Sequence, residues 1–163
     1  MDVFTARRRR HTRVLDGYRR LLVPVKAGME SEEAIDFAAR LAAEHGASIT
    51  AVAVVEVPAH LPPDAHMSDE EARAHAVLSR AAAVAERYGV SVSLRTVLAR
   101  DAGAAIVAEA RSRNSELIVV GAPRRAHANG GGAALGATVE HALRKAPCRV
   151  MVVGSRMYSR PAA

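Results

Sequence analysis

The residues best placed to bind a ligand lie between an apolar run and a helix near the end of the chain. The run Ile-Val-Val at 118–120 is followed by Gly121, and a long loop leads through Gly136 to Thr138 and a predicted helix. Glycine lets the backbone approach a ligand closely, and free N–H groups at a helix start favour an anion. The spacing therefore predicts a site for a phosphate or another small anion.

Basic side chains accompany this loop. Lys26 directly follows the apolar run 21–25, and Arg124 and Arg125 come shortly after Gly121. Ammonium and guanidinium groups pair with phosphate, so together with the glycines at 130–132 they could form a rebuilt anion site. Alternatively, the glycines are a flexible insertion and both arginines are solvated. Of the two interpretations, the sequence favours the second.

The remaining reactive residue types form no catalytic or metal-binding set. His60, His66 and His75 lack the paired spacing and the cysteine partners of a metal site. Cys148 has no base beside it in sequence, so we expect a buried structural thiol. The chain contains no nucleophile elbow, Walker motif or dinucleotide-binding fingerprint. We therefore predict no catalytic residue, no bound metal and no enzymatic activity.

Strands and helices are predicted to alternate along the chain. The strands are expected at 20–25, 48–57, 90–98, 117–120 and 148–153, and the helices at 31–45, 68–89, 102–113 and 137–145. Alternation with helix-length crossovers implies a parallel, doubly wound sheet with helices on both faces. Ligands of such sheets bind beyond the carboxyl ends of the strands, where the winding reverses. The loops after Val25 and Val120 are therefore the expected site.

Polar residues mark the helix starts and one strand end. Ser31 is predicted to cap the first helix, Ser68 and Glu71 to form a capping box for the second, and Asp101 to cap the third. Glu56 ends the second strand on the side of the expected site, where its carboxylate could bond a ribose hydroxyl or have no special role.

Composition and charge limit the class of protein. Half of the 163 residues are apolar, enough for the core of one domain, and no apolar run is long enough to span a membrane. A single cysteine and the lack of an apolar leader at the start predict a cytoplasmic protein. The net charge of +6 comes largely from seven arginines within residues 1–20, so nucleic-acid binding is not predicted.

Several segments resemble the universal stress protein family. They are LIVVG at 117–121, LGATVEHALRKAPCRVMVV at 135–153, LLVPV at 21–25 and AIDFAARLA at 34–42. The resemblance spans 19–154, which divides the chain into a flexible basic arm at 1–18, the domain, and a tail at 155–163. It implies a five-stranded sheet of the adenine nucleotide alpha hydrolase-like type with strand order 3-2-1-4-5. It also implies a homodimer formed through the last strand.

The resemblance also locates an altered nucleotide site. ATP-binding members have a Gly, two residues, a second Gly, nine residues, then Gly-Ser or Gly-Thr, and an Asp after the first strand. Gly121 and Gly136 match the outer glycines, but Arg124 replaces the second glycine, Ala137 replaces the hydroxyl residue and Lys26 replaces the Asp. The resemblance therefore implies a site that has lost the usual ATP pose. Its implied lining consists of Pro24, Val25, Lys26, Gly121, Arg124, Gly136, Ala137 and Thr138.

Three functions are compatible with the sequence. The first is a non-catalytic, dimeric regulatory module that binds a small anion, with ATP or another adenine nucleotide as a compatible ligand. The second is a relative of the regulatory domains of amino-acid permeases, whose arginine-rich arm contacts a membrane protein or an anionic surface. The third is an ATP-binding stress protein with weak hydrolysis.

Overall fold

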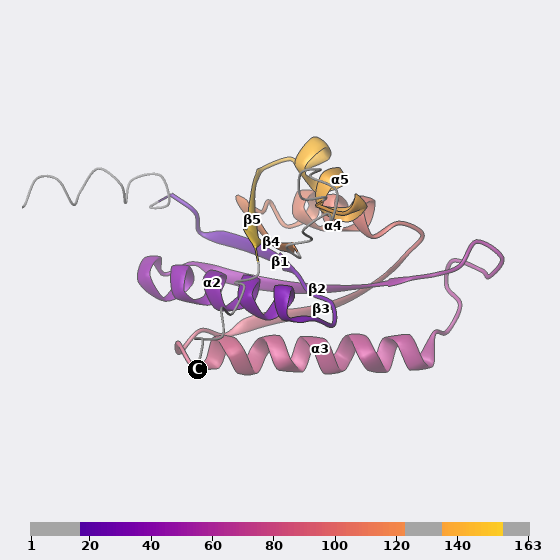
Figure 1. The fold of residues 1–163 in the computed structure, drawn as a ribbon, viewed down its shortest axis with the longest axis horizontal. Coiled ribbons are helices and arrows are strands. Elements are labelled where there is room, and N and C mark those ends of the chain that lie inside the picture. The colour runs from indigo at the N-terminus through magenta and orange to yellow at the C-terminus, as the bar shows by residue number, and fades with distance from the viewer. Residues whose placement is uncertain (1–16, 123–134, 155–163) are drawn as a thin grey trace, which may run out of the picture.

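Five strands and four helices alternate along the part of the chain that the computed structural model describes, residues 17–122 and 135–154 (Figure 1). The strands are β1 (Arg20–Pro24), β2 (Ser48–Glu56), β3 (Val92–Ala99), β4 (Leu117–Ala122) and β5 (Arg149–Gly154). The helices are α2 (Met29–His45), α3 (Ser68–Glu86), α4 (Ala102–Ser112) and α5 (Ala137–Lys145). Every predicted element is present, with ends shifted by a few residues.

The five strands form one parallel sheet in the order β3-β2-β1-β4-β5. This confirms the predicted doubly wound fold and its strand order. From β1 the chain winds outward through β2 and β3, and then returns to the other side of β1 to form β4 and β5. The winding therefore reverses between β1 and β4, which places the expected site between these two strands.

Two helices cover each face of the sheet. Helices α2 and α3 lie on one face, and α4 and α5 lie on the other (Figure 1). Successive side chains of a strand point to opposite faces, so Leu21 and Val23 of β1 join the core under α2 and α3, while Leu22 joins the core under α4. Strands buried on both faces explain the unbroken apolar runs of the sequence.

The first helix begins earlier than predicted, so the assignment of Ser31 as its cap is wrong. Helix α2 starts at Met29 after Gly28, whose φ of 135° is open to glycine alone among the common residues. Ser31 therefore lies inside the first turn, where it is buried. Its hydroxyl oxygen accepts a hydrogen bond of 2.9 Å from the backbone N–H of Lys26. Ser31 thus stabilises the turn between β1 and α2.

Of the other two predicted caps, Asp101 is confirmed and Ser68 is wrong. The Asp101 carboxylate accepts a 2.6 Å hydrogen bond from the N–H of Ala104, as an N-cap does. For α3, only half of the capping box forms: Glu71 accepts a 3.1 Å bond from the N–H of Met67, but Ser68 makes no capping bond. Met67 takes the cap position, one residue earlier than predicted.

Some sequence predictions concern residues outside the described ranges. Arg124, Arg125 and the glycines at 130–132 are among them, as are residues 1–16 of the basic arm and the tail from 155. The membrane-partner hypothesis depends on that arm and stays a prediction, as do the domain boundaries and the cytoplasmic location. Among the described helices, none combines the length and apolar character needed to cross a membrane.

Candidate functional site

A cavity of about 330 Å³ opens at the carboxyl ends of β1 and β4, where the winding of the sheet reverses. Five of the eight site residues expected from the sequence line it: Pro24, Val25, Lys26, Gly121 and Thr138. Gly136 and Ala137 lie at the start of α5 but do not line the cavity, and Arg124 is outside the described residues. We call this space the switch-point cavity.

The walls of the switch-point cavity are mainly apolar. Val52 and Val54 contribute from β2, Ile106 from α4 and Val139 from α5. None of these four residues is among the site residues expected from the sequence. The alternation of β2 shows that Val52 and Val54 share a face, but only the packing of α4 and α5 over that face reveals that it borders a cavity.

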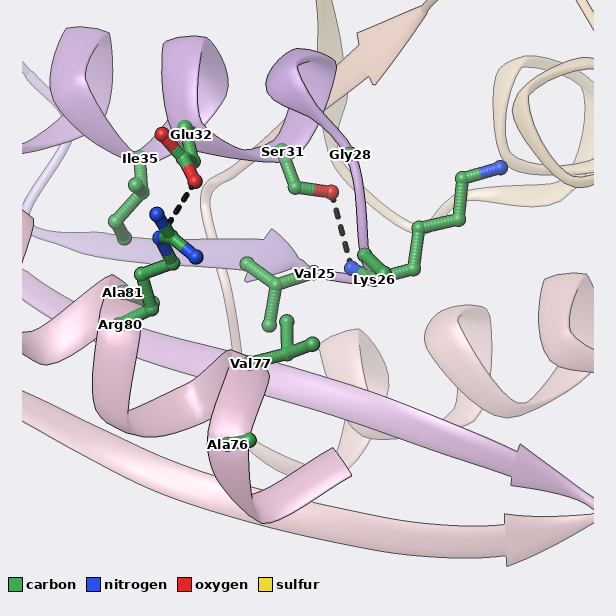
Figure 2. Close-up of a pocket in the computed structure, with 11 residues that line it drawn as sticks. Val25, Lys26, Gly28, Ser31, Glu32, Ile35, Ala76, Val77, Arg80 and Ala81 are labelled. Carbon is green, nitrogen blue, oxygen red and sulfur yellow. Dashed lines mark hydrogen bonds and ion pairs between the residues drawn. The ribbon is translucent and has the colours of Figure 1, made fainter. Parts of the chain in front are cut away.

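Lys26 brings a positive charge to the cavity. Its backbone is fixed by the bond to Ser31, whereas its exposed ammonium group has no hydrogen-bond or ion-pair partner among the described residues. Figure 2 shows the Lys26 side chain extending away from Arg80 and Ala76 of α3. The ammonium group is therefore available to a ligand without breaking an internal ion pair.

The start of α5 supplies the second polar feature. Gly136 precedes the helix with φ 83° and ψ 149°, a conformation that requires glycine, and it has no side chain with which to cap the helix. Thr138, in the first turn, is half-buried and lines the cavity. The N-terminal N–H groups of a helix favour negative charge, so this side of the cavity suits an anion.

Gly121 has a structural role that needs no ligand. A Cβ atom at this position would lie 2.0 Å from the backbone oxygen of Glu30, at the beginning of α2. Real atoms cannot approach so closely, so only glycine lets the first turn of α2 pack against the end of β4. The sequence suggested that Gly121 serves a ligand, and the structure supplies this independent reason for the glycine.

Glu56 lines the switch-point cavity and also contacts α4. One of its carboxylate oxygens accepts a 3.0 Å hydrogen bond from the N–H of Ala102, the first residue of that helix. The loop after Glu56 is held by Arg100, whose guanidinium group donates to the carbonyl oxygens of Val57, Pro58 and Leu61. The end of β2 is thus fixed at both its side chain and its backbone.

A smaller cavity of about 160 Å³ lies between α2 and α3 (Figure 2). An ion pair of 2.7 Å between Glu32 of α2 and Arg80 of α3 crosses it. Val25, Lys26 and Ser31 line both this space and the switch-point cavity. The segment after β1 is therefore the wall between the two.

The structure adds two observations on reactive groups. Cys148 is half-buried just before β5, and burial raises the pKa of its thiol, which disfavours the reactive thiolate. Within residues 17–122 and 135–154, no group of three His, Cys, Asp or Glu side chains is placed to hold a metal ion.

Comparison with solved structures reveals close likeness in fold. A universal stress protein from Archaeoglobus fulgidus superposes with a TM-score of 0.69 at 20% identity, over 83% of this chain and 98% of that chain. A universal stress protein in complex with cAMP gives a TM-score of 0.65 at 21% identity, over 84% and 97%. The A. fulgidus protein in complex with dAMP gives 0.66 at 19% identity, over 83% and 97%. No curated protein sequence matches the chain significantly.

The sequence also matches the model of the universal stress protein family over residues 17–154. This range includes every strand and helix described above, together with the switch-point cavity. The match covers well over half of the chain, and the solved structures above resemble it in fold over at least 83% of its length. The protein therefore belongs to the universal stress protein family.

Proposed function

We propose that the protein is a non-catalytic regulatory module whose switch-point cavity binds a small adenine nucleotide with a single phosphate group. The observation that supports this proposal is the combination of apolar walls with the ammonium group of Lys26, which has no partner among the described residues, in a cavity where the winding reverses. Apolar pockets with a few well-placed polar groups are typical ligand sites. Two structural neighbours are described as complexes with cAMP and dAMP.

A nucleotide fits the distribution of polar and apolar groups. The base would pack against the apolar side chains of Val52, Val54 and Ile106, where removal from water favours binding. The phosphate would lie at Lys26 and at the N-terminal end of α5, next to Thr138. Lys26 is the single cation that lines the described part of the cavity, which favours one phosphate over the three of ATP.

Two polar side chains that line the cavity, Ser31 and Glu56, each already have a structural partner, which supports a binding role without catalysis. The Ser31 hydroxyl accepts the N–H of Lys26, and the Glu56 carboxylate accepts the N–H of Ala102. Among the described lining residues there is no nucleophile hydrogen-bonded to a base, the pairing that covalent catalysis needs. Turnover of ATP in the presence of Mg²⁺ by the purified protein would contradict this part of the proposal.

Titration calorimetry with AMP, cAMP and ATP tests the binding proposal. We expect AMP to bind more tightly than ATP. Lys26→Ala should weaken AMP binding about tenfold, the usual effect of losing a charge-assisted hydrogen bond. Lys145→Ala is the matched control, because it removes the other lysine of the chain from the exposed end of α5. Absence of binding by all three nucleotides, or an equal effect of both substitutions, would refute the proposal.

We also propose that two copies associate through β5. This strand is at the edge of the sheet and pairs with β4 alone among the described strands, so one side of its backbone is open to a second copy. Size-exclusion chromatography with light scattering should give twice the mass of the chain at micromolar concentration. A monomer under these conditions would contradict the dimer.

A further inference from the structure

We infer that the Glu56 carboxylate recognises the ribose of the bound nucleotide by accepting a hydrogen bond from its 2′- or 3′-hydroxyl. This inference rests on the proposed function, since it concerns the same cavity, and it adds a specificity for ribonucleotides over deoxyribonucleotides. A carboxylate is a strong acceptor for hydroxyl groups and repels phosphate, so it separates the sugar end of a nucleotide from its anionic end.

The position of Glu56 agrees with this role. It is the last residue of β2, the strand next to β1, and it lines the switch-point cavity together with Lys26. In dinucleotide-binding α/β folds, an acidic residue that follows the first strand–helix unit binds a ribose hydroxyl. Glu56 is located comparably here, at the carboxyl end of the second strand.

The carboxylate is held in place before any ligand arrives. One oxygen accepts the N–H of Ala102, and the other has no partner among the described residues. The backbone is fixed as well: Glu56 pairs with Ala99 of β3, and the N–H of Val57 donates to the Ala99 carbonyl oxygen at 2.8 Å. Arg100 then binds the loop carbonyls that follow. A fixed acceptor loses little entropy on binding, which favours specific recognition.

The charges of the cavity match the two ends of a nucleotide. Among the described lining residues, Lys26 is the one cation and Glu56 the one anion, and the rest of the lining is largely apolar. A nucleoside monophosphate has one anionic group, a planar apolar base and two hydroxyl donors on the sugar. Lys26 matches the anionic group, the apolar lining matches the base, and Glu56 matches a sugar hydroxyl.

A purely structural role for Glu56 predicts a different outcome. As a helix cap it would be partly redundant, because Asp101 already caps α4 through the N–H of Ala104. A cap affects the stability of the fold but does not distinguish one sugar from another. Discrimination between sugars is therefore the measurement that separates the two roles.

The experiment compares the binding of AMP, 2′-deoxy-AMP and 3′-deoxy-AMP by calorimetry to the wild-type chain, to Glu56→Gln and to Glu70→Gln. The wild-type chain should bind AMP about tenfold more tightly than the deoxy analogue that lacks the contacted hydroxyl, as expected for one hydrogen bond to a charged group. The weaker analogue identifies the hydroxyl. Glu56→Gln should lower AMP affinity to that of this analogue and leave the analogue's own affinity unchanged.

Glu70→Gln removes the same charge from α3, in the groove next to the cavity, and should keep the wild-type preference. Equal binding of the three ligands by the wild-type chain would overturn this inference while the proposed function stands. A preference that persists in Glu56→Gln would also overturn it, since the discrimination would then come from another group. Absence of binding by all three would overturn both the inference and the proposed function.

Discussion

The two ends of the sheet use charge in opposite ways. At the amino end, the Glu116 carboxylate accepts the N–H groups of Arg19 at 2.5 Å and Arg20 at 3.1 Å, and it pairs with the Arg20 guanidinium group at 2.8 Å. At the carboxyl end, the ammonium group of Lys26 has no partner among the described residues. The amino end uses its charges to join β1 to β4, while the carboxyl end leaves a charge available to a ligand.

A second contrast, in how closely the elements pack, lies within the carboxyl end itself. The start of α2 approaches β4 so closely that a Cβ at Gly121 would lie within 2.0 Å of a backbone oxygen. A few residues away, the switch-point cavity leaves about 330 Å³ unfilled. The carboxyl end therefore combines a rigid contact with an open cavity, so a substitution at Gly121 should mainly affect stability and one at Lys26 should mainly affect binding.

The largest expected effect is that of Gly121→Ala. The added methyl group would collide with the Glu30 carbonyl and force α2 away from β4, so we expect the free energy of unfolding to fall by about 3 kcal/mol. Urea denaturation measures this change. Gly17→Ala is the control, because its Cβ would meet no atom within 4 Å, and its effect should stay within about 0.5 kcal/mol. Equal stability of both variants would show that the close approach is absent in solution.

A moderate effect is expected at the amino end, and it depends on pH. The N–H of Arg19, with further help from Arg20, lowers the pKa of the Glu116 carboxyl below its ordinary value of 4.5. The folded state therefore favours the ionised form. This contribution to stability is complete above the ordinary pKa and is lost as the pH falls through the lower pKa of the folded state.

Glu116→Gln should consequently be less stable than the wild-type chain at pH 7, and the difference should shrink as the solution becomes more acidic. Thermal unfolding measured between pH 7 and pH 3 checks this, with nucleotide affinity at pH 7 expected to be unchanged. A stability difference that is constant over this pH range would contradict the assigned role of the carboxylate.

The smallest effect on stability is expected for Lys26→Ala. Because the ammonium group is exposed and has no partner among the described residues, its removal should change the free energy of unfolding by less than about 0.5 kcal/mol. The same variant is the one expected to lose nucleotide affinity. Chemical denaturation without ligand provides the measurement. A loss of stability as large as that of Gly121→Ala would mean that Lys26 serves the fold, and the contrast between the structural charge of Glu116 and the available charge of Lys26 would fail.

The general plan of the fold could be predicted from the sequence because it depends on local patterns. Apolar runs such as 117–120, the alternation of strand and helix lengths, and the capping carboxylate of Asp101 act through neighbours in the chain. Helix starts depend on contacts beyond the local pattern: Gly28 lets α2 begin earlier than the sequence predicts, and Ser31 is a buried acceptor for the N–H of Lys26. A serine followed by acidic residues fits both situations, so sequence alone does not separate them.

The candidate site likewise has features that the sequence predicts and features that only tertiary contacts create. The sequence by itself determined that a lysine follows the first strand and that glycines flank the loop after the fourth strand. It also determined that both strands belong to a parallel sheet, whose strands end at the same edge. Only the tertiary structure decided that Val52, Ile106 and Val139 enclose a cavity with them, that the Glu56 carboxylate is fixed by the N–H of Ala102, and that Gly121 is required by the carbonyl of Glu30. These are contacts between residues far apart in the chain, and the spacing of residues along a sequence does not encode such distances.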